Sequence, residues 1–194
     1  MTGVLILAAG SSSRLGKPKQ NLVFEGQTLL QRAIDAALAT LCGPVIVVLG
    51  ANADEIKPTL EGKPVRIVHN NDWVEGMASS IRLGIAELQV IDPDAKAAIL
   101  MLCDQPFVST AILQQLIQSQ SKKGIAACAY NDTIGPPVLF DEFYFGELLS
   151  LKGQEGAKKL LLKYTDAVTT IPFALGSIDI DTAADFEKLT HKKA

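Results

Sequence analysis

Three cations lie close together near the start of the chain, directly after a run of small residues. Arg14, Lys17 and Lys19 fall within six positions, and no Asp or Glu occurs in the first 24 residues. Residues 8–13 read Ala-Ala-Gly-Ser-Ser-Ser and follow the apolar run Val-Leu-Ile-Leu. Backbone N–H groups in such a turn form an anion-binding concavity, and Gly10 can adopt the positive φ that a tight turn needs. This combination indicates a polyphosphate site, although an ordinary serine-rich surface loop has a similar composition.

The spacing distinguishes this loop from two common phosphate-binding motifs. A P-loop ends in Gly-Lys-Ser/Thr, and the dinucleotide fingerprint has a third glycine that opens a helix. The loop has neither feature. Its ligand must therefore be inferred together with the other polar segments of the chain.

A carboxylate follows an apolar segment in the middle of the chain. Residues 97–103 read Ala-Ala-Ile-Leu-Met-Leu-Cys, which predicts a buried strand. Asp104 comes next, and Pro106 keeps the residue before it extended. Asp104 is therefore expected either to point into a cleft at the end of the strand or to act as a turn or helix-cap residue.

Two more carboxylates alternate near the end of the chain. Residues 178–181 read Ile-Asp-Ile-Asp, which predicts a short strand with Asp179 and Asp181 on one face. Like charges on one face repel unless a cation or hydrogen bonds offset them, which favours a cation site. The alternative is that one of them caps the last helix, a role that Thr182 could fill equally well.

Residues 70–84 combine a tryptophan, small residues and hydroxyl groups around the start of a predicted helix. Periodicity places this helix at about 77–88, with Trp73 packing at its start and Ser80 as one polar position on it. The periodicity alone gives neither side chain a chemical role.

The N-terminal motif resembles that of a known family. Leu7-Ala8-Ala9-Gly10-x-x-x-Arg14-x-Gly16-x-Pro18-Lys19 is similar to the signature of the sugar-nucleotide and cofactor nucleotidyltransferases, and Pro18-Lys19-Gln20 resembles their molybdenum cofactor branch, the MobA-like nucleotidyltransferases. Such enzymes join a nucleoside monophosphate to a phosphorylated acceptor and release pyrophosphate. The resemblance implies that Arg14 and Lys19 are catalytic. It also implies nucleotide contacts from Leu7, Ala8, Ala9, Gly10, Ser11, Ser12, Arg14 and Lys19.

The carboxylates acquire a role through the same resemblance. Leu102-x-Asp104-Gln105-Pro106 resembles the family's metal-binding motif, which implies that Asp104 is catalytic, contacts the nucleotide and binds Mg²⁺. Mg²⁺ prefers oxygen ligands and often takes only one or two protein carboxylates besides phosphates. The resemblance places a second ligand in the segment that contains Asp179 and Asp181. We prefer Asp181, with Asp179 as the alternate or an additional ligand.

The tryptophan segment resembles the part of cytidylyl-transferring members that surrounds the base. The matching pattern is Trp73-x-x-Gly76-x-x-x-Ser80-Ile81-x-x-Gly84. It implies nucleotide contacts from Gly76 and Ser80 and favours CTP, because guanylyl-transferring relatives differ here.

Two later segments resemble the border of the acceptor site in the cytidylyltransferase group. They are Gly135-Pro136-Pro137-Val138-Leu139-Phe140 and Gly153-Gln154-Glu155-Gly156-Ala157-Lys158. The implied acceptor is a molybdopterin-type cofactor. Gln154 replaces the usual Asp and Lys158 replaces the usual Arg, and Lys binds phosphate as a point charge rather than bidentately. These departures leave the identity of the acceptor open.

Apolar strands that alternate with helices predict a parallel sheet covered on both faces. We expect a single α/β domain, a Rossmann-like three-layer sandwich with a mostly parallel sheet, of the type found in nucleotide-diphospho-sugar transferases. Residues 1–105 are expected to bind the nucleotide and residues 106–194 the acceptor, with a Gly/Pro turn at 131–137. Ligands of such sheets bind at the carboxyl ends of the strands. The residues that follow the first four strands, Gly10, Gly50, His69 and Asp104, should therefore share one edge.

Composition limits the classes of function. The 194 residues are 48% hydrophobic and 20% charged, which is typical of a globular domain. A net charge of −3 argues against a general nucleic-acid binder. No apolar stretch approaches the roughly 20 residues of a membrane span. The three cysteines form no Cys-x-x-Cys pair, which fits a reducing compartment, so we expect a soluble, cytoplasmic protein that binds neither nucleic acid nor membrane.

The resemblance implies a Mg²⁺-dependent enzyme that transfers CMP from CTP to the phosphate of molybdenum cofactor, with a molybdoenzyme as the recipient of the product. The alternatives are a guanylyltransferase for the same cofactor, a sugar-phosphate nucleotidyltransferase, and a non-enzymatic protein that carries the cofactor to its target.

Overall fold

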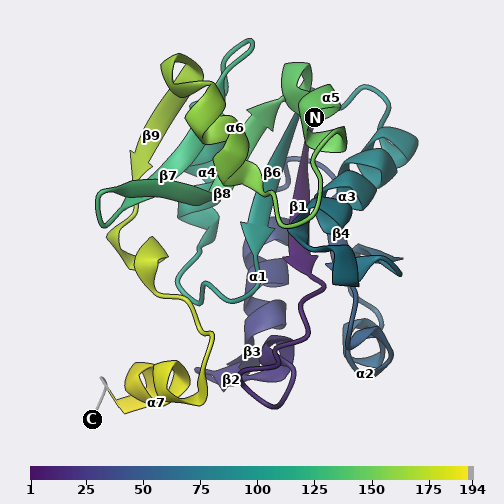
Figure 1. Cartoon of the computed structure of the whole chain (residues 1–194), viewed down its shortest axis with the longest axis vertical. Helices are drawn as coiled ribbons and strands as arrows, with labels where there is room; N and C mark the ends of the chain where they lie inside the picture. Colours follow the sequence, from purple (N-terminus) through teal and green to yellow (C-terminus); the bar gives the residue numbers. More distant parts are fainter. Residues whose placement is uncertain (192–194) are drawn as a thin grey trace.

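The computed structural model of the chain describes residues 1–191 and contains a seven-stranded sheet with strand order β5-β4-β1-β6-β8-β7-β9 (Figure 1). The strands are β1 (Thr2–Ala8), β2 (Val23–Phe24), β3 (Gln27–Thr28), β4 (Val45–Leu49), β5 (Arg66–His69), β6 (Ala97–Leu102), β7 (Ile125–Tyr130), β8 (Thr133–Asp141) and β9 (Val168–Pro172). The α-helices are α1 (Leu29–Leu38), α2 (Ala53–Ile56), α3 (Met77–Ile91), α4 (Thr110–Gln118), α5 (Phe145–Leu149), α6 (Ala157–Lys163) and α7 (Ala183–His191). Short 3-10 helices are η1 (Lys19–Asn21), η2 (Lys57–Leu60), η3 (Trp73–Glu75), η4 (Glu142–Tyr144), η5 (Thr165–Ala167) and η6 (Ala174–Ser177).

The first half of the sheet is parallel, as predicted. β1 lies between β4 and β6, so that Leu5 pairs with both Ile46 and Leu100. β5 extends the same parallel arrangement beyond β4. The carboxyl ends of these four strands therefore meet at one edge of the sheet, which confirms the expected position of Asp104 after β6.

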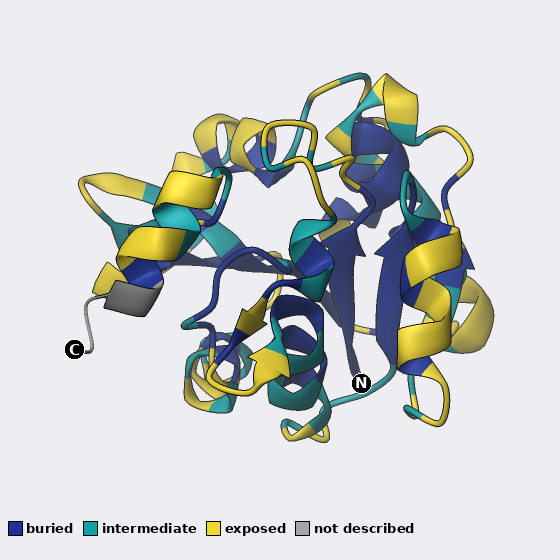
Figure 2. Cartoon of the chain, turned by 90° about the horizontal axis from the view of Figure 1, so that it is seen from below, coloured by how far each residue is buried: buried dark blue, intermediate teal, exposed yellow. Residues whose placement is uncertain are grey.

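Side chains on the two faces of the sheet belong to two separate cores. Val4 and Ile6 pack with residues of α1, α2 and α4, whereas Leu5 and Leu7 pack with residues of α3, α5 and α6. Figure 2 shows the buried strands between helices whose outer surfaces are exposed. Full burial of a side chain of this size stabilises by about 1.5–3 kcal/mol. The predicted single-domain, three-layer α/β fold is confirmed.

The expected turn at 131–137 is wrong, because most of it belongs to a strand. β8 begins at Thr133 and pairs antiparallel with both β6 and β7. Only Asn131 and Asp132 form the turn, with φ values of 46° and 55°. The register shifts between Ala127 and Cys128, and such irregularities are where prolines fit into a sheet.

The expected strand at 178–181 is also wrong. This segment forms neither helix nor strand, and Ile180 is buried against Leu22, Phe24 and Leu29 rather than in the sheet. Those partners belong to the β2–β3 hairpin and the start of α1, and the hairpin was not predicted. The segment still lies beside the edge of the sheet, because the N–H of Ile180 donates to the carbonyl oxygen of Asp104 at 3.1 Å.

Within residues 1–191, no helix combines the length and the apolar character needed to cross a membrane.

Candidate active site

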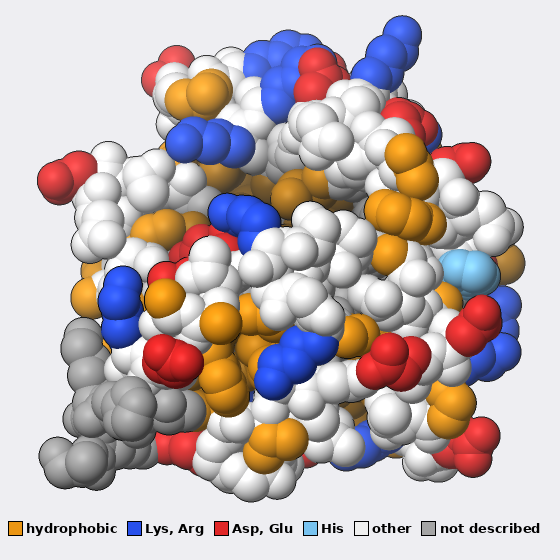
Figure 3. All heavy atoms as spheres, turned by 60° about the horizontal axis from the view of Figure 1, so that its bottom comes forward, with side chains coloured by type: hydrophobic (Ala, Val, Ile, Leu, Met, Phe, Trp, Pro, Cys, Tyr) orange, Lys and Arg blue, Asp and Glu red, His pale blue; other side chains and the backbone are white. Residues whose placement is uncertain are grey.

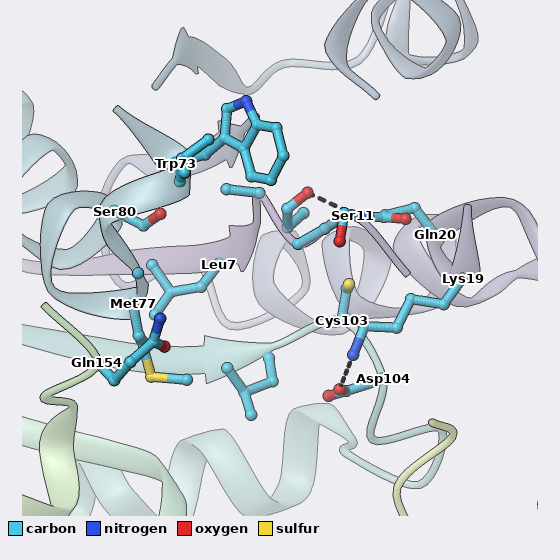
Figure 4. Close-up of a pocket in the computed structure, with 16 residues that line it drawn as sticks. Leu7, Ser11, Lys19, Gln20, Trp73, Met77, Ser80, Cys103, Asp104 and Gln154 are labelled. Carbon is cyan, nitrogen blue, oxygen red and sulfur yellow. Dashed lines mark hydrogen bonds and ion pairs between the residues drawn. The ribbon is translucent and has the colours of Figure 1, made fainter. Parts of the chain in front are cut away.

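A cavity of about 360 Å³ opens at the carboxyl ends of β1 and β6 (Figure 4). Nine of the residues predicted to bind the nucleotide line it: Leu7, Ala8, Ala9, Gly10, Ser11, Lys19, Gly76, Ser80 and Asp104. The other lining residues are Gln20, Trp73, Val74, Met77, Leu102, Cys103 and Gln154. Figure 3 views the molecule toward this edge of the sheet and shows hydrophobic, basic and acidic side chains together in a hollow.

Ser12 and Arg14, also predicted to contact the nucleotide, do not line the cavity. Ser12 folds the loop. Its Oγ accepts from the N–H of Lys19 at 3.0 Å, and its carbonyl oxygen accepts from Leu15 at 2.9 Å and Gly16 at 3.2 Å. The positive φ of the loop falls on Ser12 (54°) and Gly16 (74°) and not on Gly10, which corrects the expectation for Gly10. A side chain at Gly10 would meet nothing within 4 Å.

The side chain of Gln20 holds residues 8–10 in place through hydrogen bonds, a role that the sequence did not reveal. Its side chain is fully buried, and Nε2 donates to the carbonyl oxygens of Ala8 at 2.8 Å and Gly10 at 3.3 Å. A buried polar group is costly unless it is hydrogen-bonded, so these bonds fix Gln20 and the end of β1 together. The motif Pro18-Lys19-Gln20 was the only sequence signal for it.

Lys19 lies between two carboxylates at one end of the cavity. Its Nζ forms a hydrogen-bonded ion pair with Asp104 Oδ2 and lies 3.5 Å from Asp181 Oδ1. Burial alone would lower the pKa of Lys19, but the charges of Asp104 and Asp181 outweigh it, so that the pKa is raised above its usual value. Lys19 is therefore a fixed positive charge at neutral pH.

Arg14 approaches the same group of charges from the solvent side. Its Nη2 donates to Asp181 Oδ2 at 2.8 Å, and its side chain is 69% exposed. Asp181 thus connects Arg14 with Lys19, so the two predicted catalytic cations share one carboxylate.

Asp104, Asp179 and Asp181 were predicted to bind Mg²⁺, and the structure gives their carboxylates different surroundings. Asp104 Oδ1 is buried and has no hydrogen-bond partner among the described residues, so one oxygen ligand is available. Asp179 is exposed as a whole residue, but its carboxyl is partly desolvated, and this desolvation together with the charges of Asp104 and Asp181 raises its pKa. No group of three or more His, Cys, Asp or Glu residues within 1–191 is arranged to hold a metal. The oxygen donors of Asp104 and Asp181 fit the preference of Mg²⁺, which draws its remaining ligands from phosphates and water.

Cys103 lines the cavity but is not a nucleophile. Burial and the neighbouring Asp104 carboxylate raise the pKa of its thiol to about 12. Because the thiolate is the reactive form, the thiol of Cys103 is poorly suited to act as a nucleophile.

The opposite end of the cavity is uncharged. Figure 4 places Trp73, Ser80, Met77 and Gln154 there, away from the ion pair of Lys19 and Asp104. Ser80 is buried on α3, and its Oγ accepts a hydrogen bond from Nδ2 of Asn70 at 3.0 Å. The hydrogen bond from Asn70 thus fixes the position of the Ser80 hydroxyl, and the sequence pattern could not predict this contact.

A loop from the second half of the chain closes this uncharged end. The carbonyl oxygen of Gly153 accepts from the N–H of Ala78 at 3.1 Å, and the N–H of Gly153 donates to Glu75 Oε1 at 3.1 Å. Gly76 has a φ of 125°, and a side chain there would lie 2.5 Å from the carbonyl oxygen of Gly153. Residues before and after position 105 therefore form one cavity, while the predicted division into nucleotide and acceptor parts stays a prediction.

Gly76→Ala should destabilise the protein for two reasons. The φ of Gly76 favours glycine, and the new methyl group would collide with the backbone of Gly153. Strain of this kind costs about 1–3 kcal/mol per residue, which urea unfolding can measure. Gly10→Ala is the matched control, because its added methyl group meets nothing, and it should change stability by about 0.5 kcal/mol or less. Equal stability of the two variants would contradict the proposed contact.

Residues 4–168 match the model of the MobA-like NTP transferase domain. The chain therefore belongs to this nucleotidyltransferase family, which confirms the resemblance inferred from its motifs.

Individual relatives differ in their named activities. Nicotine blue oxidoreductase of Paenarthrobacter nicotinovorans is 38% identical over 140 residues, which cover 72% of this chain and 66% of that protein. Molybdenum cofactor cytidylyltransferase of Escherichia coli strain K12 is 27% identical over 183 residues, which cover 94% and 92%. The crystal structure of Rv0371c from Mycobacterium tuberculosis H37Rv superposes with a TM-score of 0.86 and 33% identity, covering 97% of this chain and 96% of that one. A manganese complex of the same protein superposes with a TM-score of 0.80 and 30% identity, again covering 97% and 96%.

Proposed function

We propose that this protein transfers CMP from CTP to the terminal phosphate of a molybdopterin-type cofactor. The observation that carries the proposal is the polarity of the cavity. Charged groups from Lys19, Asp104 and Asp181 lie at one end, and Trp73 and Ser80 lie at an uncharged end. A nucleoside triphosphate has the same polarity. The similarity to a molybdenum cofactor cytidylyltransferase along nearly the whole chain supports the choice of reaction.

The acceptor phosphate would attack the α-phosphorus of CTP, and the bond between that phosphorus and the β-phosphate oxygen would break to release pyrophosphate. Lys19 and Arg14 would offset the negative charge of the α-phosphate and of the leaving group. Fixed charges aimed at the place where charge develops are among the largest contributions to catalysis. The backbone of residues 8–11 would position the phosphates, held rigid by Gln20.

Asp104 and Asp181 would hold Mg²⁺, with Asp179 as the alternate or an additional ligand. When bound, Mg²⁺ would neutralise phosphate charge and orient the α-phosphate. The manganese complex of the mycobacterial relative supports a divalent cation in this family.

A second cavity, of about 620 Å³, would take part of the acceptor. Lys158 and Tyr130 line it, and Lys158 is the residue that replaces the usual Arg of the family. The hydroxyl of Tyr130 and Nε2 of Gln105 both donate to the carbonyl oxygen of Pro136, at 3.4 and 3.2 Å, so Tyr130 lies close to the residue that follows Asp104. An acceptor here would have its phosphate between the two cavities.

We place the reaction in the cytoplasm, because Cys42, Cys103 and Cys128 are all free thiols, as a reducing compartment would keep them. The product would pass from this site to a molybdoenzyme.

The experiment that tests this proposal is incubation with each of the four nucleoside triphosphates, Mg²⁺ and molybdenum cofactor, with release of pyrophosphate as the measurement. Release that depends on CTP and on the cofactor is expected. Pyrophosphate release that occurs with GTP and the cofactor, but not with CTP and the cofactor, would identify a guanylyltransferase. Binding of the cofactor without release of pyrophosphate from any nucleotide would identify a carrier.

In thermal unfolding with Mg²⁺ present, CTP should raise the melting temperature more than GTP does. A ligand that binds only the folded state stabilises it by about 2.7 kcal/mol at a hundredfold excess over its Kd. The base-binding segment around Trp73 and Ser80 motivates the choice of CTP. An equal or larger shift with GTP would overturn the assignment of cytosine.

The oxidoreductase relative supports a second candidate function. Its identity to this chain is 38%, above the 27% of the cytidylyltransferase, although it aligns over 140 residues rather than 183. An oxidoreductase would transfer electrons between an added donor and an acceptor dye and would release no pyrophosphate. Measuring both signals on one preparation separates the two functions.

A further inference from the structure

The side chain of Gln154 lines the cavity, and its amide lies against Gly76, where an added Cβ would come within 2.8 Å of Cδ and Nε2. Figure 4 places its amide at the uncharged end, beside Met77 and away from Lys19. No hydrogen bond holds this amide among residues 1–191. A free amide has an acceptor oxygen and a donor nitrogen side by side, so it can form two hydrogen bonds with the edge of a nucleotide base.

The loop that carries Gln154 is fixed before any ligand binds. Arg82 donates to both carboxylate oxygens of Glu75 at 2.8 and 2.6 Å, and also to the carbonyl oxygen of Leu151 at 2.7 Å. Glu75 in turn accepts from the N–H of Gly153. The backbone next to Gln154 is therefore bonded to the start of α3, which holds this loop at the cavity wall.

Ser80 defines a second recognition point at the same end. Because Oγ of Ser80 already accepts from Asn70 at 3.0 Å, its own hydrogen is available to donate into the cavity. Ser80 thus presents a donor, and Gln154 presents a donor and an acceptor. Cytosine carries a complementary set: an amino group that donates, and N3 and O2 that accept.

We infer that Gln154 is a specificity-determining residue that recognises cytosine. Its amide oxygen accepts from the amino group of the base, and its amide nitrogen donates to N3, while Ser80 donates to O2. This inference rests on the proposed function, since it assumes a nucleotide in the cavity. The sequence motif was expected to place residues 153–158 at the border of the acceptor site, whereas the structure places Gln154 in the first cavity with Trp73 and Ser80.

The test compares the Kd values of CTP and GTP, both with Mg²⁺, for the parent protein and for Gln154→Glu and Gln154→Ala. Quenching of Trp73 reports binding, because it is the single tryptophan of the chain and lines the cavity. The two nucleotides carry the same phosphates, so any general effect of the new negative charge cancels in the ratio of their Kd values. Gln114→Glu, on the exposed side of α4, is the control with the same change of charge.

Gln154→Glu should shift the ratio of Kd values against CTP by on the order of tenfold, as expected for loss of a base contact made by two hydrogen bonds. A carboxylate repels the lone pair of cytosine N3 but accepts from N1–H and the amino group of guanine. Gln154→Ala should weaken CTP binding and leave GTP binding nearly unchanged, and Gln114→Glu should alter neither.

A ratio within twofold of the parent in both Gln154 variants would overturn the inference, as would an equal loss of both nucleotides. The parent protein tests the proposed function separately. If the parent binds no nucleotide, or prefers GTP, the proposed function fails before any variant is compared.

Discussion

Asp104→Asn should lower turnover by on the order of 10² to 10³-fold while leaving the fold intact. The carboxylate loses its charge, and with it the attraction for Mg²⁺ and for Lys19. The fold should survive because an amide has the same shape, and the oxygen that faces Lys19 can be kept. The new NH₂ then takes the place of Oδ1, which has no partner within residues 1–191. Pyrophosphate release at saturating Mg²⁺ measures the rate, and paramagnetic resonance of Mn²⁺ measures metal binding independently of activity.

Asp141→Asn is the matched control for this substitution. Asp141 is also a buried aspartate at a strand end, and its Oδ1 accepts from the N–H of Phe143 at 3.1 Å, which an amide oxygen can also do. It ends β8 opposite Ala97, at the far end of β6 from Asp104. We expect its activity and Mn²⁺ binding to match the parent. If Asp104→Asn kept activity within a few fold of the parent, Asp104 would be only a turn residue.

The charged half of the site could be predicted from the sequence because it depends on local chemistry. Gly10 and Asp104 each lie just after a strand with a clear apolar run, and parallel strands bring their carboxyl ends together whatever the rest of the chain does. Lys19 belongs to the cationic motif that follows β1. The same reasoning gave the positions of β1, β4 and β6. A short motif and a strong periodicity are sufficient at such positions.

The remainder depended on contacts that no local pattern encodes. The alternation at 178–181 resembles a strand, but Ile180 is buried against the β2–β3 hairpin and the start of α1 and does not pair in the sheet. Prolines 136 and 137 resemble a turn, yet an irregular register in β8 accommodates them. Gln154 lines the uncharged end of the cavity, where Gly153 bonds to Glu75 and Ala78. Tertiary packing of this kind overrides local preference for strand or turn.

Substituting Lys19 and Lys17 one at a time distinguishes a loop with one specific catalytic lysine from a loop that acts as a diffuse basic patch. In a straight extended segment both side chains would point the same way, so the sequence alone could not choose between them. In the structure the two side chains lie differently, because Pro18 is followed at once by the 3-10 helix η1, which turns Lys19 inward. Lys19 lines the cavity with 19% of its side chain exposed, whereas Lys17 is exposed and has no ion pair among the described residues.

Lys19→Ala should therefore lower kcat and kcat/KM together, by on the order of 10²-fold, because its interaction strengthens as charge develops in the transition state. Lys17→Ala should raise KM only slightly, and this effect should fade at higher salt, since exposed charges are screened within about 10 Å at 0.1 M ionic strength. Steady-state pyrophosphate release at two salt concentrations measures both variants. Removing Lys19 also leaves Asp104 without its buried partner, which destabilises the fold, so rates must be measured well below the melting temperature of each variant. Similar losses in the two variants would mean that the loop acts as a diffuse cationic patch, and Lys19 would have no specific catalytic role.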